Sequence, residues 1–188
     1  FPGSWWDKPD EALIVTDAAC IRASETTGDT VSVPLPDSPV LDADGGKGSS
    51  AATLYVLTAL RKSGQSFIGG MHRSTDLGAT WTRIDSSLTS STETPTYNTL
   101  AVCQENPSVV YVSCTSFPAN RVGIFKTSDS GNTWKWVLSE DWSSYVTNNM
   151  KDAWLTREYG HGYVGAPFGL GVCARDTNTC YASTGNSF

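Results

Sequence analysis

Several kinds of residue are scarce in this chain, and each shortage excludes a class of function. Only 17% of the residues are charged, the acidic side chains outnumber the basic ones by 19 to 13, and the net charge is -6. Such a chain lacks the basic surface that nucleic acids and anionic membranes require. No run approaches the roughly 20 apolar residues of a membrane helix, and no basic and then apolar leader opens the sequence. We therefore expect neither a nucleic-acid partner nor membrane insertion.

Histidine is almost absent, which bears on metal and cofactor chemistry. The two histidines, His72 and His161, lie far apart, and neither has a second ligand at zinc spacing. The sequence also contains no phosphate-binding loop, no nucleophile elbow and no dinucleotide fingerprint. We therefore expect no metal site and no cofactor, and we interpret His72, within a strand-like run, as a packed or surface histidine.

What the chain does contain is one eight-residue pattern, Ser/Thr-x-Asp-x-Gly-x-Thr-Trp, at residues 74–81 and again at 127–134. An Asp can accept backbone hydrogen bonds in a tight turn, and a Gly two positions later can adopt the positive φ that the turn needs. The Trp then opens the next strand and can pack on a neighbouring sheet. The pattern therefore predicts a structural role for Ser74, Asp76, Gly78, Thr80, Trp81, Thr127, Asp129, Gly131, Thr133 and Trp134.

The spacing of the copies predicts a repeat architecture. A degenerate copy at 24–31 has Thr26 in place of Asp and Val31 in place of Trp, so the three motif positions are separated by steps of 50 and 53 residues. Four short β-rich runs separated by turns surround the copy at 127–134, as in a β-propeller blade. We expect an all-β chain with four-stranded antiparallel blades. Its predicted units are 1–34, 35–85, 86–138, a long inter-blade loop at 139–167, and the start of a further blade at 168–188.

The repeated pattern resembles the Asp-box, or BNR repeat, of sialidases, xyloglucan-active endoglucanases, sortilin-type sorting receptors and a photosystem assembly factor. The resemblance implies a propeller built from Asp-box turns. Propellers close with typically four to eight blades, whereas this chain carries about three blades' worth of strands. The chain is therefore expected to be a partial propeller that further blades, from the same chain or other chains, complete.

The five cysteines bear on the cellular compartment. Cys173 and Cys180 flank a six-residue hairpin and are expected to form a disulfide across it. For Cys20, Cys103 and Cys114 the sequence leaves three alternatives open: pairing with missing blades, pairing with one another, or remaining reduced in a β core. Together with the Ser/Thr-rich stretch at 86–96, these cysteines favour a secreted or lumenal protein, although the chain has no Asn-x-Ser/Thr sequon.

Strand direction alternates within a blade, so the repeated turns and the long connections belong to opposite faces. The face opposite the repeated turns collects residues 17–19, 34–50, 60–65, 115–120 and 139–167. The last segment is long and aromatic, which is typical of a functional loop. We therefore place the predicted binding residues there: Trp142, Trp154, Tyr159, His161 and Tyr163.

A glycosidase needs two carboxylates about 5 to 10 Å apart, and the candidate catalytic residues on this face are Asp17, Asp152 and Glu158. Residues 16–19 also resemble the Thr-Asp-x-Gly-Gly segment that carries a catalytic Asp in the xyloglucan-active endoglucanases, with alanines in place of both glycines. The Phe/Tyr-Arg-Ile-Pro segment of the sialidases has no counterpart. The sequence thus favours a secreted protein that acts on or binds carbohydrate, with a non-catalytic receptor or scaffold for a protein or glycan ligand as the alternative.

Overall fold

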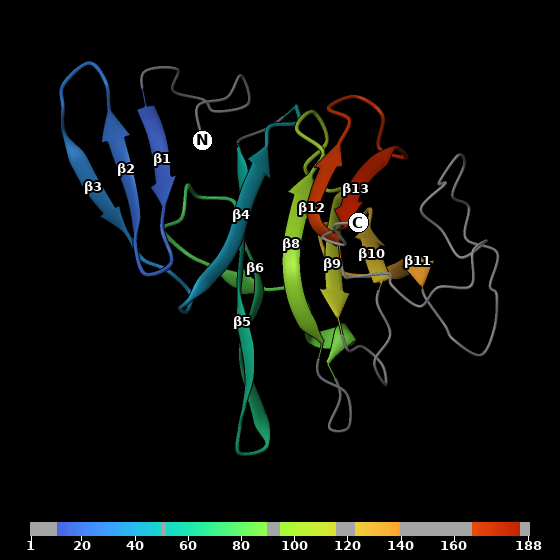
Figure 1. Ribbon diagram of the computed structural model, residues 1–188. Coiled ribbons are helices and arrows are strands. Elements are labelled where there is room, and N and C mark those ends of the chain that lie inside the picture. The colour runs from blue at the N-terminus through green and yellow to red at the C-terminus, as the bar shows by residue number, and fades with distance from the viewer. Residues whose placement is uncertain (1–10, 50–51, 90–94, 116–122, 140–166, 185–188) are drawn as a thin grey trace.

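The computed structural model describes residues 11–49, 52–89, 95–115, 123–139 and 167–184 (Figure 1). Within these ranges the regular structure is β-sheet, apart from one 3-10 turn, η1 (Ser86–Leu88), and there is no α-helix. This confirms the all-β prediction. The strands form four antiparallel sheets that follow one another in chain order and do not close into a single sheet.

The first two sheets occupy the N-terminal half of the chain. The first contains β1 (Glu11–Val15), β2 (Cys20–Ser24) and β3 (Thr30–Val33) in that order. The second contains β4 (Val40–Gly46), β5 (Thr53–Ser63), β6 (Ser66–Ser74) and β7 (Thr82–Arg83). Strand β5 comes from the most apolar stretch of the sequence, and five of its residues in succession, 54–58, are buried. Simple consecutive hairpins therefore build both sheets.

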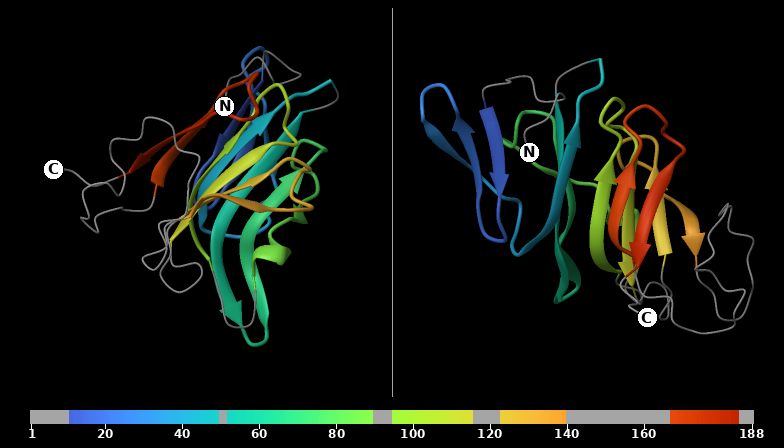
Figure 2. Two further views of the ribbon diagram at one scale, coloured as in Figure 1. Left: turned by 90° about the vertical axis from the view of Figure 1, so that its right-hand side faces the viewer. Right: turned by 45° about the horizontal axis from the view of Figure 1, so that its top comes forward.

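The third and fourth sheets continue the same connectivity. The third contains β8 (Thr96–Val102), β9 (Val110–Thr115), β10 (Gly123–Thr127) and β11 (Lys135–Ser139). The fourth contains β12 (Pro167–Val172) and β13 (Cys180–Thr184). Strand β8 contacts both β4 and β12, the first strands of the sheets on either side of it, so the first strands of these three sheets lie next to one another (Figures 1 and 2).

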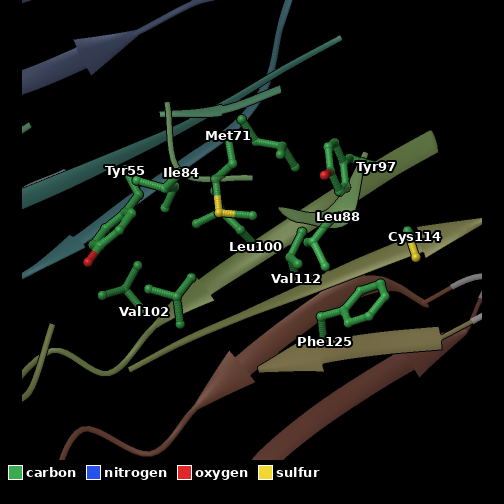
Figure 3. Close-up of a cluster of buried hydrophobic side chains, with 12 residues drawn as sticks. Tyr55, Met71, Ile84, Leu88, Tyr97, Leu100, Val102, Val112, Cys114 and Phe125 are labelled. Carbon is green, nitrogen blue, oxygen red and sulfur yellow. The ribbon is translucent and has the colours of Figure 1, made fainter. Parts of the chain in front are cut away.

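A separate apolar core fills each gap between neighbouring sheets. The largest lies between the second and third sheets and includes Tyr55, Met71, Leu100, Val112 and Phe125, all at most 3% exposed (Figure 3). Smaller clusters join the first sheet to the second and the third to the fourth. Because neighbouring sheets bury apolar side chains between them, the stability of this arrangement depends on contacts between sheets as well as on strand pairing.

The two complete copies of the repeated pattern form the same turn, between the third and fourth strands of their sheets. Asp76 accepts hydrogen bonds from the Thr80 N–H (2.9 Å) and hydroxyl (2.6 Å), and the Ser74 hydroxyl accepts one from the Gly78 N–H (2.8 Å). Asp129 receives the equivalent bonds from Thr133, at 2.8 and 2.6 Å. The predicted positive φ is confirmed at Gly78 (87°) and Gly131 (93°).

Each of these turns also attaches its sheet to the sheet before it. Trp81 donates from its indole N–H to the carbonyl of Pro34 (2.6 Å), and Trp134 donates to the carbonyl of Ile84 (3.0 Å). Both rings pack against the apolar clusters at those boundaries. The predicted role of the tryptophans in packing on a neighbouring sheet is therefore confirmed.

The expected disulfide between Cys173 and Cys180 is not formed, and all five cysteines are free thiols. The hairpin register explains the difference, because Val172 is the cross-strand partner of Cys180, and the Cys173 N–H bonds to the carbonyl of Thr179 (3.3 Å). Partners across a hairpin point to the same face and successive residues alternate. Cys173 and Cys180 therefore point to opposite faces of the hairpin.

Candidate functional site

The described residues contain a hollow of about 330 Å³ between the second sheet and the connection that leads into it from the first sheet. Its walls come from the connection between β3 and β4, from the β5–β6 hairpin and from β7. The side chains that matter for its chemistry are Asp37, Arg61, Phe67, His72 and Arg83. Residues 34–50 and 60–65 were both predicted to lie on the face opposite the repeated turns, and the hollow forms where these two segments meet.

The glycines of β6 explain why the β5–β6 ladder is irregular beside the hollow. The β5–β6 ladder pairs Thr58 with Gly70 and then Arg61 with Ile68, so two residues of β5 oppose Gly69 alone. Gly69 and Gly70 have φ of 77° and 101°, which side chains rarely adopt. This β-bulge turns the end of the hairpin away from the regular ladder, as bulges beside functional sites commonly do.

An ion pair closes one side of the hollow. Arg61 donates to the Asp37 carboxylate (2.9 Å) and to the Ser38 carbonyl (2.9 Å), and the Ser38 N–H donates to the same carboxylate oxygen of Asp37 (2.8 Å). Burial raises the pKa of Asp37, but these hydrogen bonds and the Arg61 charge outweigh it and leave the pKa below its ordinary value. Asp37 is therefore ionised at neutral pH. Of its two carboxylate oxygens, only Oδ1 accepts these hydrogen bonds.

A second charged pair involves Arg83, which also lines the hollow. Arg83 donates from Nε to Asp85 (2.6 Å) and from Nη1 to the Phe67 carbonyl (3.0 Å), and Asp85 is completely buried. The Tyr97 hydroxyl donates to the other Asp85 oxygen (2.8 Å). Gly70 lets this carboxylate approach, because a Cβ there would lie 2.4 Å from Asp85 Oδ2. The network therefore ties the wall of the hollow to the core of the third sheet.

His72 lies between these pairs and is 9% exposed. Burial lowers its pKa and Arg83 lowers it further, while Asp85 and Asp37 act in the opposite direction. Because the net shift is downward from an ordinary value near 6.5, the imidazole is neutral at pH 7. Of the two alternatives expected from sequence, a packed or a surface histidine, the structure shows the packed one, and the residue also lines the hollow.

Three buried polar atoms of the hollow have no hydrogen-bond partner within the described protein: Asp37 Oδ2, His72 Nδ1 and Arg83 Nη2. An unmet hydrogen bond of this kind costs about 1 to 3 kcal/mol. The three residues belong to three different elements, and all three line the hollow. Together they offer an acceptor, a donor and an imidazole nitrogen that can serve as either.

The residues proposed from sequence have a different placement. Asp17 lies in the exposed turn between β1 and β2, where its carbonyl accepts a hydrogen bond from the Val40 N–H (2.8 Å). That contact brings the turn next to the β3–β4 connection, which also lines the hollow. Residues 17–19 and 34–50 are expected from sequence to lie on the same face. The other candidates lie outside the described residues, and they are Trp142, Asp152, Trp154, Glu158, Tyr159, His161 and Tyr163.

Sequence reasoning missed Asp37, Arg61 and Arg83 because their partners are distant in the chain or belong to different strands. One available signal was the pair Gly69-Gly70 inside a strand-like run, which is typical of a bulge. Within the described ranges no group of three or more His, Cys, Asp or Glu side chains is arranged to hold a metal ion. In the same ranges no helix has the length and apolar character of a membrane span.

Comparison with the models of known protein families finds no match for this chain. A search of the curated proteins likewise finds no related sequence.

Proposed function

We propose that this chain is part of a secreted or lumenal Asp-box β-propeller that binds or acts on carbohydrate. Two sheets of four strands, each with the repeated turn between its third and fourth strands, support the propeller proposal. The attachment of each turn to the preceding sheet through Trp81 and Trp134 supports it as well. In this proposal, further blades from the same or other chains complete the ring.

The observation that carries the functional proposal is the polar hollow with its three unpaired buried atoms. A sugar presents several hydroxyl groups close together, and each of them can both donate and accept a hydrogen bond. Such a ligand matches a site that offers Asp37 as acceptor and Arg83 as donor within one small space. The Phe67 side chain, which also lines the hollow, supplies an apolar surface for the C–H groups of a sugar ring.

The described residues favour binding over hydrolysis at the hollow itself. Hydrolysis of a glycoside requires one carboxyl group to protonate the leaving oxygen. Asp37 is held ionised by Arg61, and Asp85 is fully buried in bonds with Arg83 and Tyr97. A hydrolytic activity in this protein is therefore assigned to Asp152 and Glu158, together with Asp17.

The test is saturation-transfer NMR of the chain with a mixture of neutral and acidic oligosaccharides, followed by an assay for released reducing ends. We expect signal transfer to at least one sugar. Asp152→Asn and Glu158→Gln should abolish hydrolysis while they leave binding intact. Absence of transfer to every sugar in the mixture contradicts the carbohydrate proposal.

The alternative is a non-catalytic extracellular receptor or scaffold, and one observation favours it. The carboxylates of Asp76 and Asp129, whose pKa values lie at about 2, are engaged in hydrogen bonds within their own turns. These carboxylates stabilise the backbone of the two turns, which is a structural role of the kind expected in a scaffold. Binding of a protein ligand with no transfer to any sugar would support this alternative.

A further inference from the structure

We infer that the hollow between the β3–β4 connection and the second sheet selects an uncharged sugar ring through two neighbouring hydroxyl groups. These hydroxyls bridge Asp37 and Arg83. This inference rests on the proposed carbohydrate function and narrows the ligand from carbohydrates in general to a neutral vicinal diol. It also places the site in the β3–β4 connection and the β5–β6 hairpin.

The charges around the hollow argue for a neutral ligand. Two guanidinium groups, those of Arg61 and Arg83, are each paired with a carboxylate, Asp37 and Asp85 respectively. His72 adds no charge at neutral pH, because burial holds its pKa below the ordinary value. An anionic ligand would have to break one of these pairs or lie beside an ionised carboxylate, and both are unfavourable. An uncharged ligand meets neither penalty.

The unpaired atoms argue for hydroxyl groups in particular. Asp37 Oδ2 is an acceptor and Arg83 Nη2 is a donor. Hydroxyl groups can donate to the first and accept from the second, and they can bond to His72 Nδ1 in either direction. A ligand with only donors or only acceptors would leave part of this set unmet.

Access to the buried atoms depends on Arg61. Its side chain is 45% exposed, whereas those of Asp37 and Arg83 are 18% and 25% exposed. Arg61 is the most exposed member of the charged wall, so its movement is the least costly way to admit a ligand. A volume of about 330 Å³ is at the low end of the range for ligand pockets, which suits a single ring better than a long oligosaccharide.

The experiment measures dissociation constants by NMR titration of the chain with methyl glycosides. The neutral probes are those of glucose, galactose, mannose and xylose, and the anionic probes are those of glucuronic acid and N-acetylneuraminic acid. We expect at least one neutral glycoside to shift the amide signals of residues 37–38 and 67–70. A deoxy analogue lacking either bridging hydroxyl should bind about tenfold more weakly.

Matched variants locate the site. Arg83→Lys removes the forked donor and should weaken the neutral glycoside at least tenfold. Arg175→Lys, at an arginine that is 84% exposed and paired with Glu105, should leave binding unchanged. Asp37→Asn should weaken neutral glycosides and strengthen binding of glucuronate, since it removes one negative charge from the wall. Asp29→Asn, in the turn before β3, is its control. Asp37 is partly exposed, so this variant tests the site even where Arg83→Lys impairs folding.

The outcomes separate the inference from the function on which it rests. Preferential binding of the anionic glycosides, or neutral binding that is insensitive to Asp37→Asn and Arg83→Lys, overturns the inference and leaves the carbohydrate proposal standing. Failure of every glycoside to bind overturns the inference, and the oligosaccharide experiment then decides separately on the function.

Discussion

The indole N–H of Trp134 donates a hydrogen bond of 3.0 Å to the carbonyl of Ile84, fifty residues earlier in the chain and on the preceding sheet. Trp81 makes the corresponding bond of 2.6 Å to Pro34. In the same two places, a Cβ on Gly131 would lie 2.6 Å from Ile84 Cβ, and one on Gly78 would lie 2.3 Å from Val33 Cγ1. The repeated turn is therefore the point at which each sheet docks on its predecessor.

Trp134→Phe should lower the free energy of unfolding by about 1 kcal/mol, because the ring remains while its hydrogen bond is lost. Trp134→Ala should cost about 3 kcal/mol, since the packing against the large apolar cluster disappears as well. Urea denaturation followed by circular dichroism measures both changes. Equal losses for the two variants would show that the hydrogen bond, and not the ring, holds the turn to the sheet.

Gly131→Ala should be much more harmful than Gly64→Ala. Both glycines have positive φ, 93° and 63°, so both substitutions impose backbone strain of about 1 to 2 kcal/mol. Only Gly131 also faces Ile84, whereas a Cβ on Gly64 meets nothing within 4 Å. We expect an extra loss of about 1 to 3 kcal/mol at Gly131 from overpacking. Similar unfolding midpoints for the two variants would contradict the docking role of the turn.

Asp129 should make the protein sensitive to acid. Hydrogen bonds from the hydroxyl and N–H of Thr133 hold the pKa of Asp129 at about 2, below the ordinary value near 3.9. A lowered pKa in the folded state gives stability that is present above about pH 4 and is lost as the pH falls toward 2.

Thr133→Val removes the hydroxyl donor, so the pKa of Asp129 should rise and the acid unfolding midpoint should move to higher pH. Carbon-13 NMR titration of the carboxylate measures the first effect and circular dichroism the second. Thr30→Val, at an exposed position of β3, is the control and should leave both values unchanged.

Asp44 should act in the opposite direction. Burial raises its pKa to about 6, against the lowering effect of hydrogen bonds from the N–H groups of Val102 (2.8 Å) and Gly45 (2.8 Å). A raised pKa in the folded state gives stability that is present below about pH 4 and is lost as the pH rises to 6. Asp44→Asn should therefore flatten the stability profile between pH 4 and 6. A profile with the wild-type slope in this range would exclude Asp44 as its cause.

Tyr97→Phe should lower the free energy of unfolding by about 1 to 3 kcal/mol, because one oxygen of the buried Asp85 carboxylate loses its donor. Tyr181→Phe, at a side chain that is 70% exposed, should change stability by less than about 0.5 kcal/mol. Chemical denaturation compares the two variants. A negligible loss for Tyr97→Phe would mean that water or another donor replaces the tyrosine at Asp85.

Much of the local structure follows from short stretches of sequence. The runs at 99–103 and 109–113 predict strands that overlap β8 and β9, because their alternating and β-branched residues suit a pleated surface. The roles of the Asp, Gly and Trp of the repeated pattern can also be predicted. The Asp and Gly shape a turn of a few residues, and the Trp packs on the neighbouring repeat. The Cys173–Cys180 expectation failed because a shift of one residue in a hairpin register reverses the face on which a side chain lies.

The sequence by itself determined that this is an all-β chain of repeated antiparallel units and where its tight turns lie, because those features depend on local backbone preferences and on a period visible in the chain. Only the tertiary structure decided that Asp37 meets Arg61 across 24 residues and that His72 and Arg83 face the same hollow. Their meeting depends on the bulge at Gly69, the β-hairpin register and the packing of one sheet on the next. None of these long-range relationships is encoded in the type or spacing of the residues that form the hollow.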